Sequence, residues 1–272
     1  MEFLIHKYSG AGNDFLVIDG RDPAAKLPDT DDIRLLCSRE EGFRAADGRT
    51  GADGLMVLGV PEKDGCDFTM GFWNPDGSCG MMCGNGGRCI AAFADFLGIA
   101  PANGAFYVFS APDGLHSAEV LSRNGRRLEV KLGMCDVSGV KEMPGGLFLN
   151  TGTRHFVTVR PSVDDIDVAG EGSALRHDAA FAPEGTNVNF VEIIGDRDIR
   201  VRTFEKGVEA ETLACGTGIV ASAIAVHLST GGGSGDHIYH VHARTDSLSV
   251  SFTALPDGRF TSIHLCGPAE RI

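Results

Sequence analysis

Two cysteines stand in matching glycine-rich loops, one in each half of the chain. Cys83 opens the run Cys-Gly-Asn-Gly-Gly, and Cys215 opens Cys-Gly-Thr-Gly 132 residues later. Each run leads into an apolar, helix-like segment, so each thiol should lie at a helix start, where unpaired N–H groups and the helix dipole stabilise a thiolate. The same N–H groups can hold a carboxylate. A thiolate and a thiol on opposite sides of a stereocentre suit racemisation or epimerisation, because one removes a proton and the other delivers one.

An amino-acid Cα–H is a weak acid, and pyridoxal phosphate is the usual electron sink for its removal. The chain has only six lysines, and none lies in an obvious phosphate-binding loop. No lysine follows a glycine, so a P-loop is also excluded. We therefore expect no cofactor, and we expect water exclusion and oriented N–H dipoles to stabilise the carbanion instead.

Strand-like segments dominate the rest of the chain, and several of them alternate polar and apolar side chains with the period of a half-buried strand. The predicted strands are residues 3–9, 14–19, 54–60, 67–73, 105–110, 115–122, 126–132, 155–160, 188–194, 199–204, 238–243, 248–255 and 259–265. Residues 31–39 are predicted to form a short surface helix.

Two segments, 89–97 and 219–228, are alanine-rich and apolar nearly all round, and each is followed by a glycine suited to a C-terminal cap. A helix without a polar face is buried on all sides. One such helix in each half of a strand-rich chain predicts an α+β fold with two pseudo-symmetric domains. Each domain would be a mostly antiparallel β-barrel wrapped around its helix.

The approach to each helix also repeats. A polar residue ends a strand, Asn74 in one half and Glu205 in the other, and the cysteine follows nine or ten residues later. We interpret this as a diverged internal duplication. The expected domains are residues 1–127, which carry Cys83, and residues 128–264, which carry Cys215. The segment 265–272 could pack against the first domain.

The formal net charge of −13 argues against nucleic acid and anionic membranes as partners. No apolar run approaches the ~18 residues of a membrane span, and the N-terminus lacks the basic region and apolar core of a signal peptide. We therefore expect a cytoplasmic protein whose eight cysteines are mostly reduced. The cysteines without a chemical context are expected in the core; they are Cys37, Cys66, Cys89, Cys135 and Cys266.

In its motifs the chain resembles the diaminopimelate epimerase family. The matching segments follow the family's order: Ser-Gly-Ala-Gly-Asn-Asp-Phe (9–15), Asn-Pro-Asp-Gly-Ser (74–78), Met-Cys-Gly-Asn-Gly-Gly-Arg-Cys (82–89), Thr-Asn-Val (186–188), Glu-Lys-Gly (205–207), Glu-Thr-Leu-Ala-Cys-Gly-Thr-Gly (211–218) and Gly-Pro-Ala (267–269). The resemblance implies a cofactor-independent isomerase that interconverts LL- and meso-2,6-diaminopimelate in lysine and peptidoglycan precursor biosynthesis. It also implies a site in the cleft between two barrel domains, and it is compatible with a homodimer.

The resemblance implies a role for each matching position. Cys83 and Cys215 resemble the acid–base pair, and His155 and Glu205 resemble the polar partners that set thiol protonation. The side chains that grip the distal, non-reacting stereocentre would be Asn13, Asn74 and Asn187, with Glu205 and Lys206 facing the same end. The N–H groups that hold the carboxylate at the reacting carbon would come from Gly84, Asn85, Gly216 and Thr217.

Two segments depart from the family's pattern, and both bear on the distal group. The usual Glu-Arg-Gly is Glu-Lys-Gly here, and Lys206 grips a carboxylate only as a point charge where arginine would bind it bidentately. The usual Asn-Pro-His is Thr153-Arg154-His155, which loses an amide and offers Arg154 as a compensating cation. A related racemase of another amino acid, of the proline or histidine class, is therefore the alternative function.

Metal sites are a weaker interpretation of two clusters. Cys79, Cys83 and Cys89 lack the repeated CxxC spacing of zinc ligands. His237, His240 and His242 lie along a predicted strand, where a solvated face is the commoner explanation. A metal-binding or amino-acid-binding protein ranks last, because binding alone does not require a matched thiol in each half.

Overall fold

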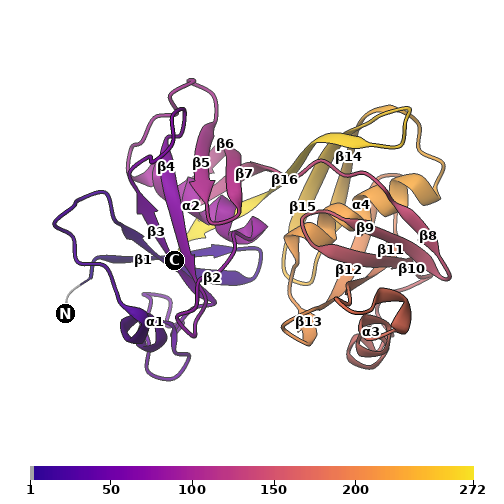
Figure 1. Ribbon diagram of the computed structural model, residues 1–272, viewed down its shortest axis with the longest axis horizontal. Helices are drawn as coiled ribbons and strands as arrows, with labels where there is room; N and C mark the ends of the chain where they lie inside the picture. Colours follow the sequence, from indigo (N-terminus) through magenta and orange to yellow (C-terminus); the bar gives the residue numbers. More distant parts are fainter. Residues whose placement is uncertain (1–2) are drawn as a thin grey trace. The chain divides into compact units, whose positions relative to one another are not determined.

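The chain folds into two units, each with its own strands and its own buried helix (Figure 1). This computed structural model describes residues 3–272. Met1–Leu132 and Gly267–Ile272 form the first unit, and Gly133–Cys266 form the second. Within the described residues, no helix is long and apolar enough to cross a membrane.

The first unit is a closed barrel of eight strands. They pair in the order β1-β2-β3-β4-β5-β6-β7-β16, and β16 pairs back onto β1. The strands are β1 (Ile5–Gly10), β2 (Asn13–Asp19), β3 (Gly54–Gly59), β4 (Phe68–Trp73), β5 (Tyr107–Ala111), β6 (Gly114–Asn124), β7 (Arg127–Gly133) and the end of β16 (Phe260–Arg271). Helix α1 (Thr30–Cys37) lies between β2 and β3 in the chain, and α2 (Gly84–Phe96) lies between β4 and β5.

The second unit uses the beginning of β16 and pairs its strands in the order β16-β15-β14-β12-β11-β10-β9-β8. Its own strands are β8 (Lys141–Met143), β9 (Gly146–Asn150), β10 (Arg154–Val159), β11 (Asn187–Ile193), β12 (Asp198–Glu205), β13 (Ala210–Thr212), β14 (Gly235–His242) and β15 (Ser247–Ala254). The chain leading into β8 returns to β16 through a bridge between Val137 and Phe260. The helices are α3 (Val168–Arg176), the 3-10 turn η1 (Ala179–Phe181) and α4 (Gly216–Ser229).

The order of pairings repeats between the units. In the first unit β1–β2 is antiparallel, β2–β3 parallel, β3–β4 antiparallel and β4–β5 parallel. In the second unit β9–β10, β10–β11, β11–β12 and β12–β14 follow the same sequence of directions. The helices occupy equivalent connections, since α1 and α3 cross the first parallel pair and α2 and α4 cross the second. The predicted fold class, two similar α+β barrel units, is confirmed.

Helices α2 and α4 form the centres of the two cores. Every residue of α2 from Gly84 to Ala94 is buried, and so is all but one residue of α4 from Gly216 to His227. Gly98 and Gly231 follow the helix ends with φ of +72°, which L side chains rarely adopt, so both predicted C-terminal glycines are confirmed.

The helices begin at Gly84 and Gly216, directly after the two cysteines as expected, so the predicted apolar segments 89–97 and 219–228 cover only their later residues. Glycine and asparagine lack the apolar periodicity that marks a helix, so the first turn of each was interpreted as loop. The predicted surface helix is present as α1. Strands β8, β9 and β13 and helix α3 were not predicted.

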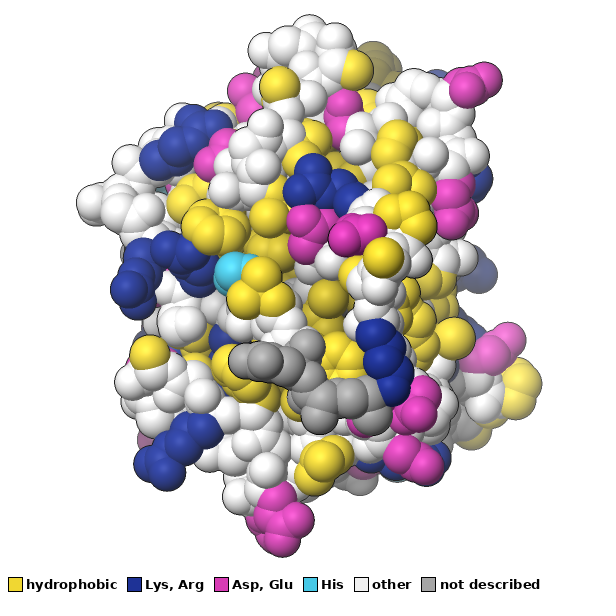
Figure 2. Space-filling view, turned by 90° about the vertical axis from the view of Figure 1, so that its left-hand side faces the viewer, with side chains coloured by type: hydrophobic (Ala, Val, Ile, Leu, Met, Phe, Trp, Pro, Cys, Tyr) yellow, Lys and Arg dark blue, Asp and Glu magenta, His cyan; other side chains and the backbone are white. Residues whose placement is uncertain are grey.

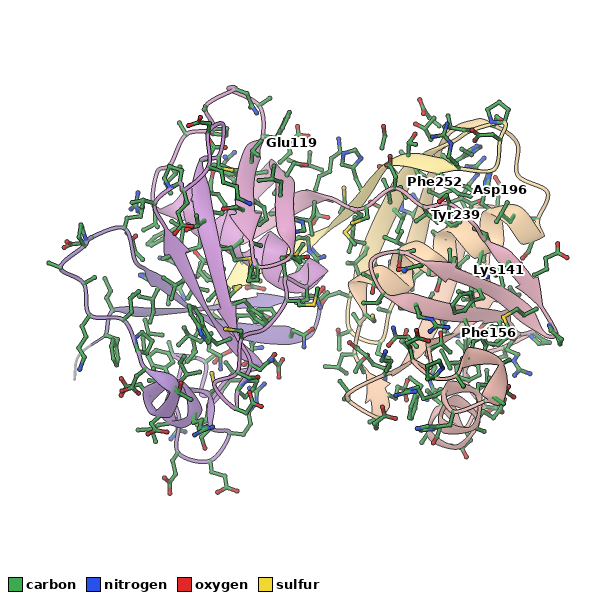
Figure 3. The ribbon with its side chains drawn as sticks, viewed as in Figure 1. Glu119, Lys141, Phe156, Asp196, Tyr239 and Phe252 are labelled. Atoms are coloured by element: carbon green, nitrogen blue, oxygen red, sulfur yellow. The ribbon has the colours of Figure 1, made fainter. Side chains whose placement is uncertain are left out.

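Apolar side chains fill the space between helix and strands. In the second unit, Tyr239 of β14 and Phe252 of β15 stack with ring centroids 5.9 Å apart (Figure 3). On the face drawn in Figure 2, basic and acidic side chains are interspersed with apolar ones.

Candidate active site

Cys83 and Cys215 are the N-cap residues of the two buried helices. Both have extended backbones, with φ of −113° and −115°, and the glycine-rich residues after them form the first helical turn. The Cys83 sulfur accepts a hydrogen bond from the N–H of Gly86 at 3.3 Å. The Cys215 sulfur lies 3.5 Å from the hydroxyl oxygen of Thr217. The first N–H groups of a helix have no partner within the helix, so each thiol stands beside donors suited to an anion.

In the first unit a chain of hydrogen bonds connects two predicted substrate-binding side chains. Asn85 donates from Nδ2 to Oδ1 of Asn13 at 2.7 Å, and Asn13 donates from Nδ2 to Asp53 at 2.9 Å. The side-chain Oδ1 of Asn85 accepts from the fully buried Arg88 at 2.8 Å, and Asp53 pairs with Arg39. The Asn13 side chain therefore uses one N–H and one oxygen lone pair in this chain, and one N–H and one lone pair remain.

A buried ion pair lies next to this chain of hydrogen bonds, at the residue that follows Asn13. Lys7 reaches Asp14 at 2.7 Å and also donates to the carbonyl of Gly51 at 2.6 Å. Burial acts to raise the pKa of Asp14, but hydrogen bonds from Arg39 and Lys7 outweigh it and lower that pKa. Asp14 thus remains a carboxylate and fixes the backbone next to Asn13.

Asn74 lies apart from this chain, at the turn after β4. Its Nδ2 donates to the Ser78 hydroxyl at 3.0 Å, and its backbone N–H donates to the Ser78 carbonyl. The turn therefore holds the Asn74 side chain in one orientation. Neither of these two hydrogen bonds involves its side-chain oxygen, Oδ1, which can accept one.

In the second unit, His155 is fully buried below the start of α4. Its Nδ1 lies 2.8 Å from Oδ1 of Asn189, whose amide donates to Thr203 at 2.8 Å, so Nδ1 carries the ring hydrogen. Burial lowers the pKa of His155 to about 4, although the Asn189 hydrogen bond acts in the opposite sense. The ring is therefore neutral near pH 7, with Nε2 as an acceptor facing Thr153 and Thr217 at 2.9 and 3.0 Å.

Glu205 ends β12 and accepts a hydrogen bond from the Thr212 hydroxyl at 2.9 Å. Burial raises the pKa of this carboxyl, and the Thr212 hydrogen bond only partly opposes that shift. A carboxyl of this kind accepts a proton more readily than an exposed one, which suits a group that exchanges protons with a thiol.

The Asn187 amide donates two hydrogen bonds and accepts one. Its Nδ2 donates to the Arg154 carbonyl at 2.9 Å and to the Thr153 hydroxyl at 3.3 Å, and its Oδ1 accepts from the backbone N–H of Lys206 at 2.8 Å. Asn187 thus forms hydrogen bonds with both segments that depart from the family's pattern. Lys206 itself is exposed, whereas the Arg154 guanidinium pairs with Glu184 and lies over the Phe148 ring.

Asp53, Arg88, Thr153 and Asn189 connect the predicted residues but were not singled out as site residues. Close approach explains one glycine of the motif. A Cβ at Gly218 would lie 2.4 Å from the Asn189 amide nitrogen and 3.2 Å from the His155 ring, so α4 can approach β10 and β11 only with glycine there.

The remaining cysteines and histidines show no comparable arrangement. All eight cysteines are thiols. Cys37, Cys66 and Cys89 are buried as expected, whereas Cys135 is exposed and Cys266 is only half-buried, so the predicted core position is wrong for these two. His237 accepts from Arg197 and contacts the Gly233 carbonyl. Among residues 3–272, no three His, Cys, Asp or Glu side chains are grouped to hold a metal.

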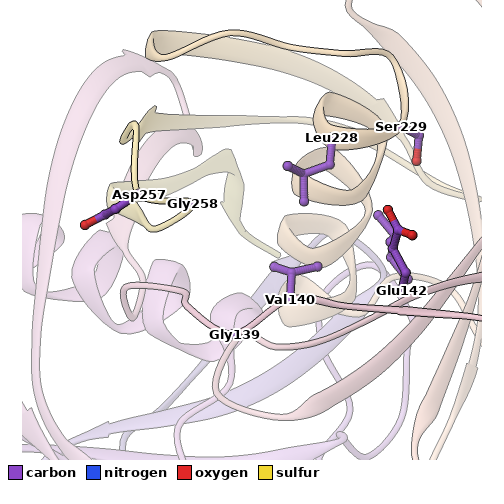
Figure 4. Close-up of a pocket in the computed structure, with 8 residues that line it drawn as sticks. Gly139, Val140, Glu142, Leu228, Ser229, Asp257 and Gly258 are labelled. Carbon is purple, nitrogen blue, oxygen red and sulfur yellow. The ribbon is translucent and has the colours of Figure 1, made fainter.

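Neither of two surface pockets contains a predicted site residue. One, of about 450 Å³ in the second unit, is lined by residues at the end of α4 and by the turns around Gly139 and Gly258 (Figure 4). The other, of about 460 Å³ in the first unit, lies beside Trp73 and Gly71. The chemically distinctive groups are the two helix starts.

Known proteins share this chain's fold. The solved PhzF-family phenazine biosynthesis protein of Bacillus anthracis superposes with a TM-score of 0.72 at 13% identity, covering 100% of this chain and 98% of that one. A probable proline racemase of Agrobacterium radiobacter gives 0.65 at 16% identity, covering 98% and 90%. At these identities the likeness shows the fold alone, so it does not favour the racemase alternative.

Sequence relatives are much closer. The diaminopimelate epimerase of Flavobacterium psychrophilum is 39% identical over 267 residues, which are 98% of this chain and 96% of the relative. That of Chlorobaculum tepidum is 38% identical over 269 residues, 97% of each chain. The family model described as diaminopimelate epimerase matches residues 5–136 and 147–255. The chain therefore belongs to the diaminopimelate epimerase family.

Proposed function

We infer that this chain is a diaminopimelate epimerase, an isomerase that interconverts LL- and meso-2,6-diaminopimelate. The observation that carries this inference is the pair of N-cap cysteines, one in each unit, on a chain of this family. We further propose that each unit acts as one domain and that substrate binds in the cleft between them, with Cys83 and Cys215 on opposite faces of one α-carbon.

The proposed reaction transfers two protons and needs no cofactor. One cysteine acts as thiolate and takes the Cα proton, so that an S–H bond forms as the C–H bond breaks. The other cysteine acts as thiol and delivers its proton to the opposite face, so that a new C–H bond forms with inverted configuration. The N–H groups of Gly84, Asn85, Gly216 and Thr217 would hold the carboxylate and stabilise the charge that develops on it.

The hydrogen bonds within each unit refine the roles proposed for the binding residues. Asn13 keeps one N–H that no hydrogen bond within the unit uses, so it would donate to a carboxylate oxygen at the distal stereocentre. Asn187 would act indirectly, by holding the backbone of Lys206, whose exposed ammonium would pair with the distal carboxylate. Asn74 and Glu205 would accept from the distal ammonium, and His155 would support the thiols.

The test is proton exchange in deuterated water without added cofactor. Purified protein given LL-diaminopimelate should produce the meso isomer with deuterium at one α-carbon. Cys83→Ala and Cys215→Ala should each lower turnover by at least ~100-fold, the scale of acid–base catalysis. Cys79→Ala and Cys135→Ala are matched controls, because both cysteines are exposed, and they should retain activity.

Two results would overturn the proposal. Wild-type turnover by Cys215→Ala would exclude the two-thiol mechanism. Turnover of proline or histidine, with none of diaminopimelate, would instead support the alternative substrate class. A cytoplasmic location and a homodimeric assembly complete the proposal, and the assembly can be checked by sedimentation.

A further inference from the structure

Three side chains form a hydrogen-bonded triangle beside Cys215. The Thr153 hydroxyl lies 2.9 Å from Nε2 of His155, the Thr217 hydroxyl lies 3.0 Å from the same nitrogen, and the two hydroxyl oxygens are 3.0 Å apart. The Thr217 oxygen is also 3.5 Å from the Cys215 sulfur. All four residues belong to the second unit. The triangle therefore links a buried imidazole to the thiol through a shared hydroxyl.

The two hydroxyls share one acceptor on the histidine ring. Because Nδ1 of His155 donates to Asn189, Nε2 offers one lone pair, which only one hydroxyl can use at a time. The other hydroxyl then donates to the neighbouring hydroxyl oxygen, 3.0 Å away, or, in the case of Thr217, to the Cys215 sulfur. Thr153 also accepts from Asn187 at 3.3 Å, so its oxygen is satisfied in either arrangement.

We propose that Thr153 is a positioning residue that lets the Thr217 hydroxyl follow the protonation state of Cys215. With Cys215 as thiolate, Thr153 donates to His155 and Thr217 donates to the sulfur. With Cys215 as thiol, Thr217 donates to His155 and its oxygen accepts the S–H. Only hydroxyl rotations separate the two arrangements. The inference rests on the proposed function in one respect, that an epimerase uses both states of Cys215.

Other ionisable groups lie around this end of α4 and could also affect the pKa of Cys215. On β10, Arg154 pairs with Glu184 and His155 is the ring already described. At the end of β12, Glu205 accepts from Thr212, and on β13 Glu211 pairs with Arg202 and Arg244. These groups are present equally in a variant at Thr153, so their effect on Cys215 cancels in the comparison.

The test is the pH dependence of Cys215 alkylation without substrate. In Thr153→Val the His155 acceptor can be satisfied only by keeping the Thr217 hydroxyl on it, so the thiolate loses a donor. We expect its apparent pKa to rise by about one unit, and alkylation by iodoacetamide near neutral pH to slow about tenfold. Thr153→Ser retains the hydroxyl and should behave as wild type. Exposed Cys135, followed in the same digest by mass spectrometry, controls for reagent reactivity.

Activity provides the second readout. The alkaline shift should appear in the pH profile of kcat/KM, with equal loss in both reaction directions because the overall equilibrium is unchanged. An unshifted alkylation profile for Thr153→Val, or an equal shift in Thr153→Ser, would overturn the proposal. If the wild-type protein failed to turn over diaminopimelate while the alkylation shift were present, the proposed function would fail and the switch would stand.

Discussion

His155 shows how a single buried side chain makes the second unit sensitive to pH. The pKa of His155 is about 4 in the folded state, against 6.5 for an exposed histidine, so the folded chain binds this proton more weakly than the unfolded chain does. The corresponding stability is complete above pH 6.5 and is lost as the pH falls towards 4. The shift corresponds to about 3 kcal/mol of unfolding free energy.

We expect the variant His155→Gln to lose less unfolding free energy at acidic pH than the wild-type protein does. Urea unfolding of wild type and variant between pH 7.5 and 4 should show the wild-type protein losing more stability below pH 6.5. Glutamine does not titrate, so the difference between the two curves isolates this ring. Parallel curves over the whole range would show that the ring is not held neutral by burial.

The sequence could locate the reactive residues but not their supports. Cys83 and Cys215 are recognisable because glycines and an apolar helix follow each of them. Asn189 is not recognisable, because it reaches His155 only through the parallel pairing of β10 with β11, and nothing in the spacing of 34 residues predicts that register. Thr153 was interpreted as a lost amide, whereas its hydroxyl contacts the imidazole.

Among the elements, α4 depends on a glycine at its third position. A Cβ at Gly218 would meet the Asn189 amide, which hydrogen bonds to His155 and Thr203 and cannot easily move. Overpacking of this kind costs about 1–3 kcal/mol, and the better helix propensity of alanine recovers at most about 1 kcal/mol. Gly218→Ala should therefore destabilise the protein and displace the start of α4 from His155.

Urea unfolding and turnover together check this expectation. The matched control is Gly233→Ala, because a Cβ there meets nothing within 4 Å and the residue does not have a positive φ. We expect the control to stay within about 0.5 kcal/mol of wild type with full activity. Equal behaviour of the two variants would mean that close approach at Gly218 does not position the site.

Prediction of the elements followed the strength of their apolar pattern. Most strands of the two barrels and the bodies of α2 and α4 carry clear apolar patterns, and the sequence predicts them, whereas it does not predict β8, β9 and β13. Helix α3 has two glycines and little apolar periodicity, so its helical form depends on packing. Val168 is buried in a cluster with Phe204, and Gly172 approaches the same phenylalanine so closely that a Cβ would lie 2.5 Å from it.

At the scale of the whole molecule, one strand serves both barrels. Residues 260–266 of β16 belong to the second unit and pair with β15, whereas the residues after them pair with β7 and β1 of the first unit. The first barrel is therefore completed by residues 267–271, which are more than 130 positions away in the sequence from the strand β7 that they pair with. Gly267 and Pro268 interrupt the strand pattern of the residues before them. From the sequence, a return of residues 265–272 to the first domain is therefore only one possibility.

Deleting residues 267–272 should open the first barrel and spare the second. The deletion removes the partners of Val130, Leu128 and Tyr8, together with the Pro268 carbonyl that accepts from buried Arg88. Hydrogen exchange measured by mass spectrometry should then show faster exchange in β1 and β7, because their amides lose a neighbouring strand. Strands β10, β11 and β12 should keep wild-type protection.

Activity should also fall, since Arg88 holds Asn85 at the start of α2. Faster exchange in β10–β12 to the same extent would show that the units unfold as one body, and unchanged exchange in β1 and β7 would show that the barrel does not need this strand.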